Sequence, residues 1–170
     1  KLWKRTFNVS DDRGNHFYAD ASSDSPSVPR AYLLIIEISF VFGECDLSAD
    51  LFADAFGSDR TIVNTPGIKG IILETYGSGN APRKEWFIRR LRNACEQGIV
   101  IVNVTQCSAG TVEMERYETG YQLMQAGVVC GYDSTTESAV TKLMFLLGHG
   151  YTPDEVRKRM RTPMAGEITI

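Results

Sequence analysis

Two segments of the sequence place small, polar and potentially reactive side chains directly after a β-branched apolar run. Residues 71–75 lead into Tyr-Gly-Ser-Gly-Asn at 76–80, and residues 100–104 lead into Thr-Gln-Cys-Ser-Ala-Gly at 105–110. A buried parallel strand typically ends in this way, and ligands of open α/β sheets collect where such strands end. The candidate binding residues in the two loops are Ser78, Asn80, Thr105, Gln106 and Cys107.

The first loop has the chemistry to hold a small carboxylate or amide. Glycines let backbone N–H groups approach a ligand closely, and a helix N-terminus favours anions. The side-chain amide of Asn80 both donates and accepts hydrogen bonds. A plain tight turn with Asn80 in the left-handed conformation explains the same residues equally well. A dinucleotide-binding fingerprint is disfavoured, because Pro82 stands where its third glycine belongs and only Glu96 is available as the acidic partner.

Cys107 is the one candidate nucleophile in these loops. A reactive thiolate needs a neighbouring base or a positive field, and His149 is expected at the far end of a later helix. Cys107 is therefore interpreted as a small buried residue or as the lining of a ligand pocket. The four cysteines form no Cys-x-x-Cys pair and only two histidines exist, so no metal site is expected. Unpaired thiols are typical of a cytoplasmic protein.

Strand and helix patterns alternate along the part of the chain that carries these loops. The pattern predicts strands at 31–42, 68–74, 99–104 and 128–130, and helices at 83–97, 113–126, 134–147 and from 153, with a further short helix at 50–56. Short connections between them imply right-handed crossovers. We therefore predict an α/β fold: a small parallel sheet of about four strands flanked by helices.

Local signals specify several helix ends and faces. Ser134 with Glu137, and Thr152 with Glu155, each form the pattern of a capping box. The helix at 113–126 is expected to turn Tyr121, Leu123 and Met124 inward, and that at 83–97 to turn Trp86, Phe87, Leu91, Ala94 and Cys95 inward.

The N-terminal region has a different composition. Residues 1–30 are polar, with a Ser/Asp/Pro-rich tract at 22–29, and are interpreted as an extended connector preceding a domain at 31–170. The whole chain is 43% apolar and 23% charged with a net charge of −3, and it has no basic stripe, so no nucleic-acid partner is expected. The apolar run at 31–43 contains Glu37 and is too short for a membrane span. Its excess of apolar residues favours association between copies of the chain.

Five segments carry a family resemblance: residues 74–82, 98–107, 117–120, 127–133 and 137–143. Together they resemble the C-terminal domain of cytosolic type I L-asparaginases over residues 66–169. Residues 15–29 are more loosely similar to the interdomain segment of that family. The resemblance implies a flavodoxin-like α/β fold, a cytoplasmic homodimer or homotetramer, and no cofactor.

The resemblance also implies an activity, the hydrolysis of L-asparagine to L-aspartate and ammonia. The family's catalytic Thr-Gly-Gly-Thr and Thr-Asp-Thr motifs belong to an N-terminal asparaginase domain, and neither motif occurs in these 170 residues. No catalytic residue is therefore expected in this chain, which would act only with that partner domain. Glutamine, lysophospholipid and tRNA-linked amide substrates remain open alternatives.

The resemblance assigns roles to two loop residues. Asn80 matches an asparagine that reaches toward a bound amino acid across the dimer, and with the cysteine matching Cys107 it resembles part of an allosteric asparagine site in bacterial enzymes. Glu74 departs from those enzymes, which have an arginine there, and its negative charge would not favour a carboxylate. Two alternatives to an enzyme are a non-catalytic amino-acid-binding regulatory module and a nucleotide-binding flavodoxin-like domain.

Overall fold

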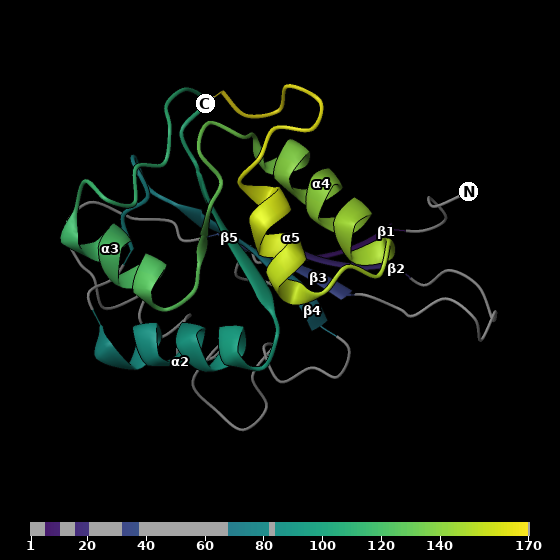
Figure 1. Ribbon diagram of the computed structural model, residues 1–170, viewed down its shortest axis with the longest axis horizontal. Helices are drawn as coiled ribbons and strands as arrows, with labels where there is room; N and C mark the ends of the chain where they lie inside the picture. Colours follow the sequence, from purple (N-terminus) through teal and green to yellow (C-terminus); the bar gives the residue numbers. More distant parts are fainter. Residues whose placement is uncertain (1–5, 11–15, 21–31, 38–67, 82–83, 170) are drawn as a thin grey trace.

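The computed structural model describes residues 6–10, 16–20, 32–37, 68–81 and 84–169. These residues form one sheet with the strand order β1-β2-β3-β4-β5-β6 and four helices (Figure 1). The strands are β1 (Thr6–Ser10), β2 (His16–Asp20), β3 (Tyr32–Glu37), β4 (Ile68–Thr75), β5 (Val100–Thr105) and β6 (Val129–Cys130). The helices are α2 (Glu85–Glu96), α3 (Glu118–Gln125), α4 (Thr136–Gly148) and α5 (Pro153–Met160).

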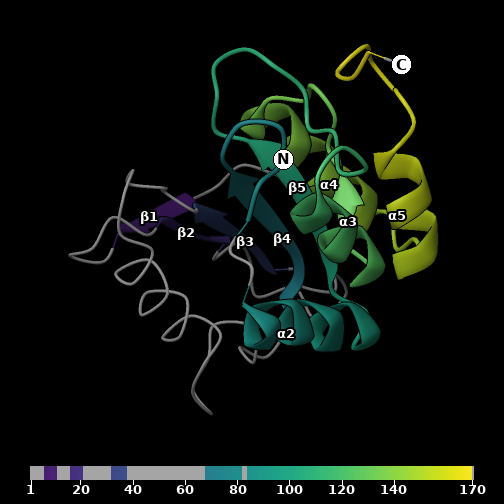
Figure 2. The same ribbon diagram turned by 90° about the vertical axis from the view of Figure 1, so that its left-hand side faces the viewer.

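The parallel part of the sheet agrees with the prediction. β3, β4, β5 and β6 pair in parallel in sequence order, which gives the four expected strands. β1 and β2 add two antiparallel strands beside β3, at the end of the sheet away from α5 (Figure 2). These two strands lie within the stretch interpreted as an extended connector, so part of that stretch extends the sheet. The expected helix at 50–56 and residues 38–42 of the expected first strand lie outside the described residues.

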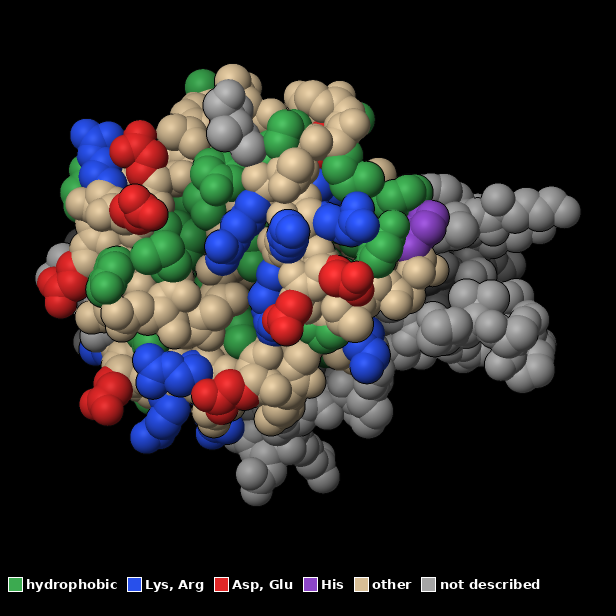
Figure 3. All heavy atoms as spheres, viewed as in Figure 1, with side chains coloured by type: hydrophobic (Ala, Val, Ile, Leu, Met, Phe, Trp, Pro, Cys, Tyr) green, Lys and Arg blue, Asp and Glu red, His purple; other side chains and the backbone are tan. Residues whose placement is uncertain are grey.

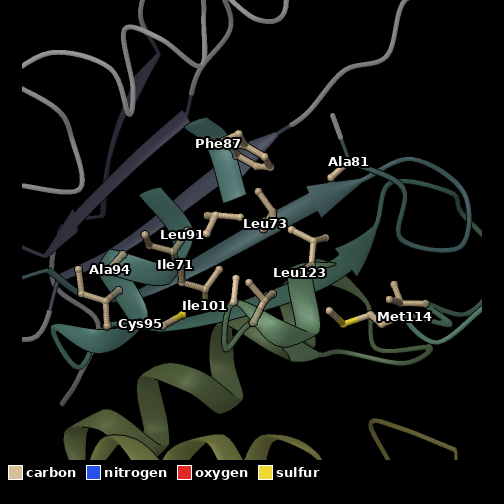
Figure 4. Close-up of a cluster of buried hydrophobic side chains, with 14 of the residues drawn as sticks. Ile71, Leu73, Ala81, Phe87, Leu91, Ala94, Cys95, Ile101, Met114 and Leu123 are labelled. Carbon is tan, nitrogen blue, oxygen red and sulfur yellow. The ribbon is translucent and has the colours of Figure 1, made fainter. Parts of the chain in front are cut away.

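Helices cover both faces of β4 and β5 (Figure 1). Successive strand side chains point to opposite faces, so Ile71 and Leu73 pack against α2 and α3 while Ile72 packs against α4 and α5. Figure 4 shows the first of these clusters, in which Phe87 and Leu91 of α2 lie over β4. Every residue of β5 is buried, which explains the continuous apolar run in its sequence.

Two helices follow their sequence signals closely. α2 buries Phe87, Leu91, Ala94 and Cys95 as predicted, with Trp86 partly buried against them. α5 has the predicted capping box: the Thr152 side chain accepts from the backbone of Glu155, whose carboxylate accepts from the backbone of Thr152. Pro153 occupies the first turn of α5, where its missing N–H costs no helical hydrogen bond.

The helix expected at 113–126 is shorter than predicted, because α3 begins only at Glu118. The backbone N–H groups of Val112 and Glu113 donate to other loops instead, at 2.9 Å each. Tyr121 is 48% exposed, so its expected inward orientation is wrong, whereas Leu123 is fully buried. Residues 114–116 form a turn, in which the N–H of Arg116 donates to the carbonyl of Glu113 at 3.1 Å, and the helix begins only after it.

The start of α4 is shifted by one residue from the prediction. Thr135, not Ser134, caps the helix, and its Oγ1 accepts from the backbone N–H of Ser138 at 3.2 Å. Ser134 is buried and donates to the carbonyl of Thr135. In the part of the chain that the structure describes, no helix is long and apolar enough to cross a membrane.

Candidate ligand-binding site at the strand ends

The two loops predicted to form a site leave the sheet side by side. β4 and β5 pair in parallel with Thr75 opposite Thr105, so both strands end at the same edge. The backbone N–H of Gln106 donates to the carbonyl of Thr75 at 2.9 Å, and its side-chain amide donates to the carbonyl of Glu74 at 3.2 Å. Ser78, Asn80, Thr105, Gln106 and Cys107 therefore all lie on loops at this edge, and their role in binding stays a prediction.

Residues 76–80 form a tight turn, which we call turn 76–80. The carbonyl of Tyr76 accepts from the N–H groups of Gly79 at 3.3 Å and of Asn80 at 3.0 Å. The left-handed positions are Gly77 (φ +58°) and Gly79 (φ +104°), so the expectation of a left-handed Asn80 is wrong. A Cβ on Gly79 would lie 2.8 Å from Cγ1 of Val112, so backbone and space both require glycine there.

The side chain of Asn80 is held at one end and open at the other. Thr119 Oγ1 donates to Asn80 Oδ1 at 3.1 Å, which fixes the amide orientation. The half-buried Asn80 Nδ2 has no acceptor among the described residues. Asn80 thus presents an oriented N–H donor, which is the group needed to bind a carboxylate or carbonyl oxygen.

The loop at 105–110, which we call loop 105–110, is more exposed. Thr105 is nearly buried, and its Oγ1 accepts from the backbone N–H of Cys107 at 3.1 Å. Cys107 is exposed, so the interpretation as a small buried residue is wrong. Because α4 starts beside this edge at Thr136, His149 at its other end lies roughly 20 Å further along the axis, at about 1.5 Å per residue. Cys107 and His149 therefore do not form a pair.

Sequence reasoning missed a buried polar pair beneath turn 76–80. Thr75 Oγ1 donates to Asn103 Oδ1 at 2.7 Å and lies 3.3 Å from the carbonyl of Val104. Asn103 is fully buried, and its Nδ2 lies 3.1 Å from the position that a Cβ of Gly79 would occupy. Asn103 interrupts the apolar run of β5, which is the available signal, since a buried amide is usually paired with other polar groups. Only its Oδ1 is paired among the described residues, and the buried Nδ2 has no hydrogen-bond partner there.

Glu74 is directed toward the start of α4. Thr136 Oγ1 donates to its carboxylate, and the side chain is half-buried. A carboxylate near a helix N-terminus is favourably placed with respect to the helix dipole. The hydrogen bond from Thr136 thus holds the carboxylate of Glu74 between β4 and the start of α4.

A groove of about 550 Å³ lies next to the site, lined by residues 111–116, Met124, Val128, Cys130, Tyr132 and Arg161. None of the five predicted binding residues lines it. The Cys130 Sγ donates to the carbonyl of Val112 at 3.2 Å, and burial raises the pKa of this thiol despite the hydrogen bonds that lower it. Cys130 is therefore a packing residue of the groove rather than a nucleophile.

Among the basic residues of α5, Arg157 contributes to the packing of that helix, whereas Lys158 and Arg159 are exposed. Figure 3 shows Lys and Arg side chains gathered over α5, in the middle of the face in view. Arg157 bridges to Asp154 at 2.7 Å and donates to the carbonyl of Cys95 at 2.7 Å, which ties α5 to the end of α2. Basic side chains at a helix C-terminus complement the dipole, as predicted. Within the described residues, no group of three or more His, Cys, Asp or Glu side chains could hold a metal ion.

The parallel strands, the covering helices and the two loops at one edge define a parallel α/β domain. Residues 50–160 match the family model of the glutaminase/asparaginase C-terminal domain, and the chain belongs to this family. This finding confirms the resemblance seen in the sequence.

Known proteins that resemble the chain are considerably longer. L-asparaginase 1 of Escherichia coli K12 is 44% identical over 110 residues, which are 65% of this chain and 32% of that protein. The 60 kDa lysophospholipase of Mus musculus is 40% identical over 112 residues, which are 65% of this chain and 20% of that protein. The crystal structure of L-asparaginase I from Vibrio cholerae aligns with a TM-score of 0.67 and 33% identity, covering 81% of this chain and 38% of that one. The chain thus spans about a third or less of the curated relatives.

Proposed function

We propose that this chain is the C-terminal part of an enzyme that hydrolyses L-asparagine to L-aspartate and ammonia. The observation that carries the proposal is the membership of the glutaminase/asparaginase C-terminal domain family together with 44% identity to an L-asparaginase. The chain lacks the Thr-Gly-Gly-Thr and Thr-Asp-Thr motifs. Its role is therefore to complete ligand binding and association, while an N-terminal asparaginase domain supplies the catalytic threonines.

Turn 76–80 is the proposed ligand contact. Thr119 fixes the Asn80 amide so that Nδ2 is the open donor. An oriented donor on a packed turn binds a carboxylate or amide oxygen with little loss of side-chain entropy. Ser78 on the same turn, and Thr105, Gln106 and Cys107 on the adjoining loop, surround that donor in the proposed site.

Asn80 has two candidate uses in such an enzyme. L-Asparagine carries the same carboxylate as a substrate and as an effector, so the charge of Glu74 does not distinguish between them. We propose that Asn80 contacts the substrate held by a neighbouring subunit, in a cytoplasmic homodimer or homotetramer formed through these domains. Allosteric control by asparagine is the alternative, and sigmoidal kinetics in asparagine would indicate it.

Reconstitution tests the proposal. The chain would be joined to the N-terminal domain of an L-asparaginase, and ammonia release from L-asparagine would be measured for wild type, Asn80→Ala and a control, Asn93→Ala, which changes an exposed asparagine of α2. Loss of one ligand hydrogen bond should raise KM roughly ten- to a hundredfold, about 1–3 kcal/mol of binding. The control should leave KM unchanged.

Each other outcome has a defined meaning. Wild-type kinetics in Asn80→Ala would show that turn 76–80 makes no ligand contact. Absence of ammonia release, combined with tight asparagine binding by the 170-residue chain alone, would favour an amino-acid-binding module. Release of fatty acid from a lysophospholipid, without activity on asparagine, would place the protein with its lysophospholipase relatives.

A further inference from the structure

A buried ion pair fastens the C-terminal residues 161–169, which we call the strap, onto α4. Lys142 Nζ lies 2.5 Å from Glu167 Oε1, and the two side chains are 5% and 11% exposed. The same ammonium donates to the carbonyls of Thr162 at 2.7 Å and Met160 at 3.3 Å. Its three N–H groups therefore all have acceptors, so the buried cation is fully paired.

The carboxylate of Glu167 is equally well paired. It accepts from the backbone N–H groups of Ala165 at 2.7 Å and Met164 at 3.0 Å. Burial acts to raise the pKa of Glu167, but the bonds from Lys142 and from the backbone outweigh it and lower the pKa from 4.5 to about 2. The Glu167 carboxylate is thus charged throughout the physiological range, and removing it would leave the buried Lys142 ammonium without its ionic partner.

The far end of the strap reaches the sheet edge that carries the candidate site. The backbone N–H of Thr169 donates to Asp133 Oδ1 at 2.8 Å. Asp133 belongs to the loop after β6, which is joined to β5 because Gly131 N–H donates to the carbonyl of Asn103 at 2.8 Å. The strap therefore spans from α4 to the carboxyl end of the sheet.

The loop that receives the strap is strained. Tyr132 has a φ of +56°, and it is the one described residue other than glycine in the left-handed region. Such a conformation is energetically unfavourable and persists only where surrounding contacts enforce it. The bond from Thr169 to the adjacent Asp133 is one of those contacts.

A continuous series of backbone bonds leads from this loop to turn 76–80. The carbonyl of Tyr132 accepts from Val112 N–H at 2.9 Å, and the next residue, Glu113, donates its N–H to the carbonyl of Ser78 at 2.9 Å. The side chain of Val112 also fills the space against Gly79. The position of turn 76–80 therefore depends on the residue 112–113 segment, which depends in turn on the conformation of Tyr132.

We propose that the strap positions turn 76–80 and hence Asn80. Lys142 and Glu167 fasten the strap, Asp133 receives its end, and the bonds of Tyr132, Val112 and Glu113 transmit the constraint. Asp133 and Glu167 are positioning residues. The coupling between the strap and turn 76–80 is argued from the contacts above. Its effect on the binding of asparagine rests on the proposed function.

Residue-resolved amide hydrogen exchange on the 170-residue chain tests the coupling. Asp133→Ala, which leaves the ion pair intact, should speed exchange at Val112, Glu113 and Asn80 roughly tenfold, while the amides of buried β5 stay unchanged. Asp133→Asn keeps an acceptor oxygen and should restore wild-type rates. Glu155→Gln weakens the capping box at the start of α5. Among the described residues, Thr152 and Glu155, which form this box, have no bond to residues 112–113 or 132–133, so the three amides should be unaffected. Unchanged exchange at these amides in Asp133→Ala, or an equal acceleration in β5, would overturn the proposal.

The reconstituted enzyme separates this proposal from the proposed function. Asp133→Ala should raise KM for asparagine roughly three- to tenfold, as expected for a residue that acts through a coupled segment. Faster exchange in the turn without any change in KM would retain the strap as a positioning device and remove the ligand role of turn 76–80. Glu167→Gln should reproduce the exchange pattern wherever the variant remains folded, and a folded variant with wild-type exchange would exclude Glu167 as the fastener.

Discussion

The two loops at the candidate site are held very differently, although they leave adjacent strands at the same edge. Turn 76–80 has bonds within itself, accepts a bond at Ser78 from Glu113 and a bond at Asn80 from Thr119, and has a glycine packed against Val112. Loop 105–110 is tied to the sheet only near its start, and residues 107–110 are exposed. A binding group needs a supported position. The difference therefore favours turn 76–80 over Cys107 as the ligand-determining part of the edge.

Matched glycine substitutions should reveal this difference most strongly. In Gly79→Ala the added methyl group would meet Val112 at 2.8 Å and Asn103 at 3.1 Å, at a φ of +104°. Steric overlap and backbone strain together should lower the free energy of unfolding by about 3 kcal/mol or more. In Gly110→Ala, where φ is +130° and no atom lies within 4 Å, the strain alone should cost about 1 kcal/mol. Urea unfolding midpoints measure both. Equal midpoints for the two variants would show that the loops do not differ in packing.

A second comparison removes one hydroxyl beneath each loop. Thr75→Val removes the partner of Asn103 Oδ1 in a fully buried setting, and should lower the free energy of unfolding by roughly 2 kcal/mol. Thr105→Val removes only the acceptor of the Cys107 N–H, at the border of the exposed loop, and should cost about 1 kcal/mol or less. Unfolding in guanidinium chloride measures both free energies, provided that the dependence on denaturant concentration is the same in the variants and the wild type. A larger loss of unfolding free energy in Thr105→Val than in Thr75→Val would contradict the conclusion that turn 76–80 is better supported than loop 105–110.

The parallel strands and most of the helix faces could be predicted because their signals are local. Periodicity specified α2, and a capping box specified the start of α5. The pattern failed at residues 113–117, a segment whose start is bonded to the distant Tyr132 and Ser78 through the N–H groups of Val112 and Glu113. No single-sequence rule encodes such partners.

The candidate site shows the same division between local and distant contacts. The loops after β4 and β5 could be predicted because strand and helix patterns alternate along the chain. Asn80 could be selected because it is an amide on a turn that contains glycines. The requirement for glycine at position 79 was hidden, because it arises from Val112, which is 33 residues away. The ion pair between Lys142 and Glu167 could not be predicted either, since a buried ion pair produces no periodic pattern in the sequence.

The smallest effects on the free energy of unfolding are expected at the cysteines. Here the comparison mainly concerns the reactivity of the thiols. Cys107→Ser replaces an exposed thiol and should change the free energy of unfolding by less than about 0.5 kcal/mol. The thiolate is the form that reacts with iodoacetamide. Burial raises the pKa of Cys95 to about 11, with Glu96 adding to the rise and Arg157 opposing it. At pH 8 the Cys95 thiol is therefore protonated as well as shielded.

Peptide mapping after brief alkylation of the native chain should find Cys107 modified well before Cys95 and Cys130. Alkylation of the unfolded chain in urea supplies the reference, in which the three thiols should react at similar rates. Modification of Cys95 as fast as Cys107 in the native chain would mean that the packing of α2 on the sheet opens readily. A loss of more than 1 kcal/mol in Cys107→Ser would mean that loop 105–110 carries structural contacts comparable to those of turn 76–80. The second result would remove the contrast between the two loops on which the assignment of the ligand contact to Asn80 depends.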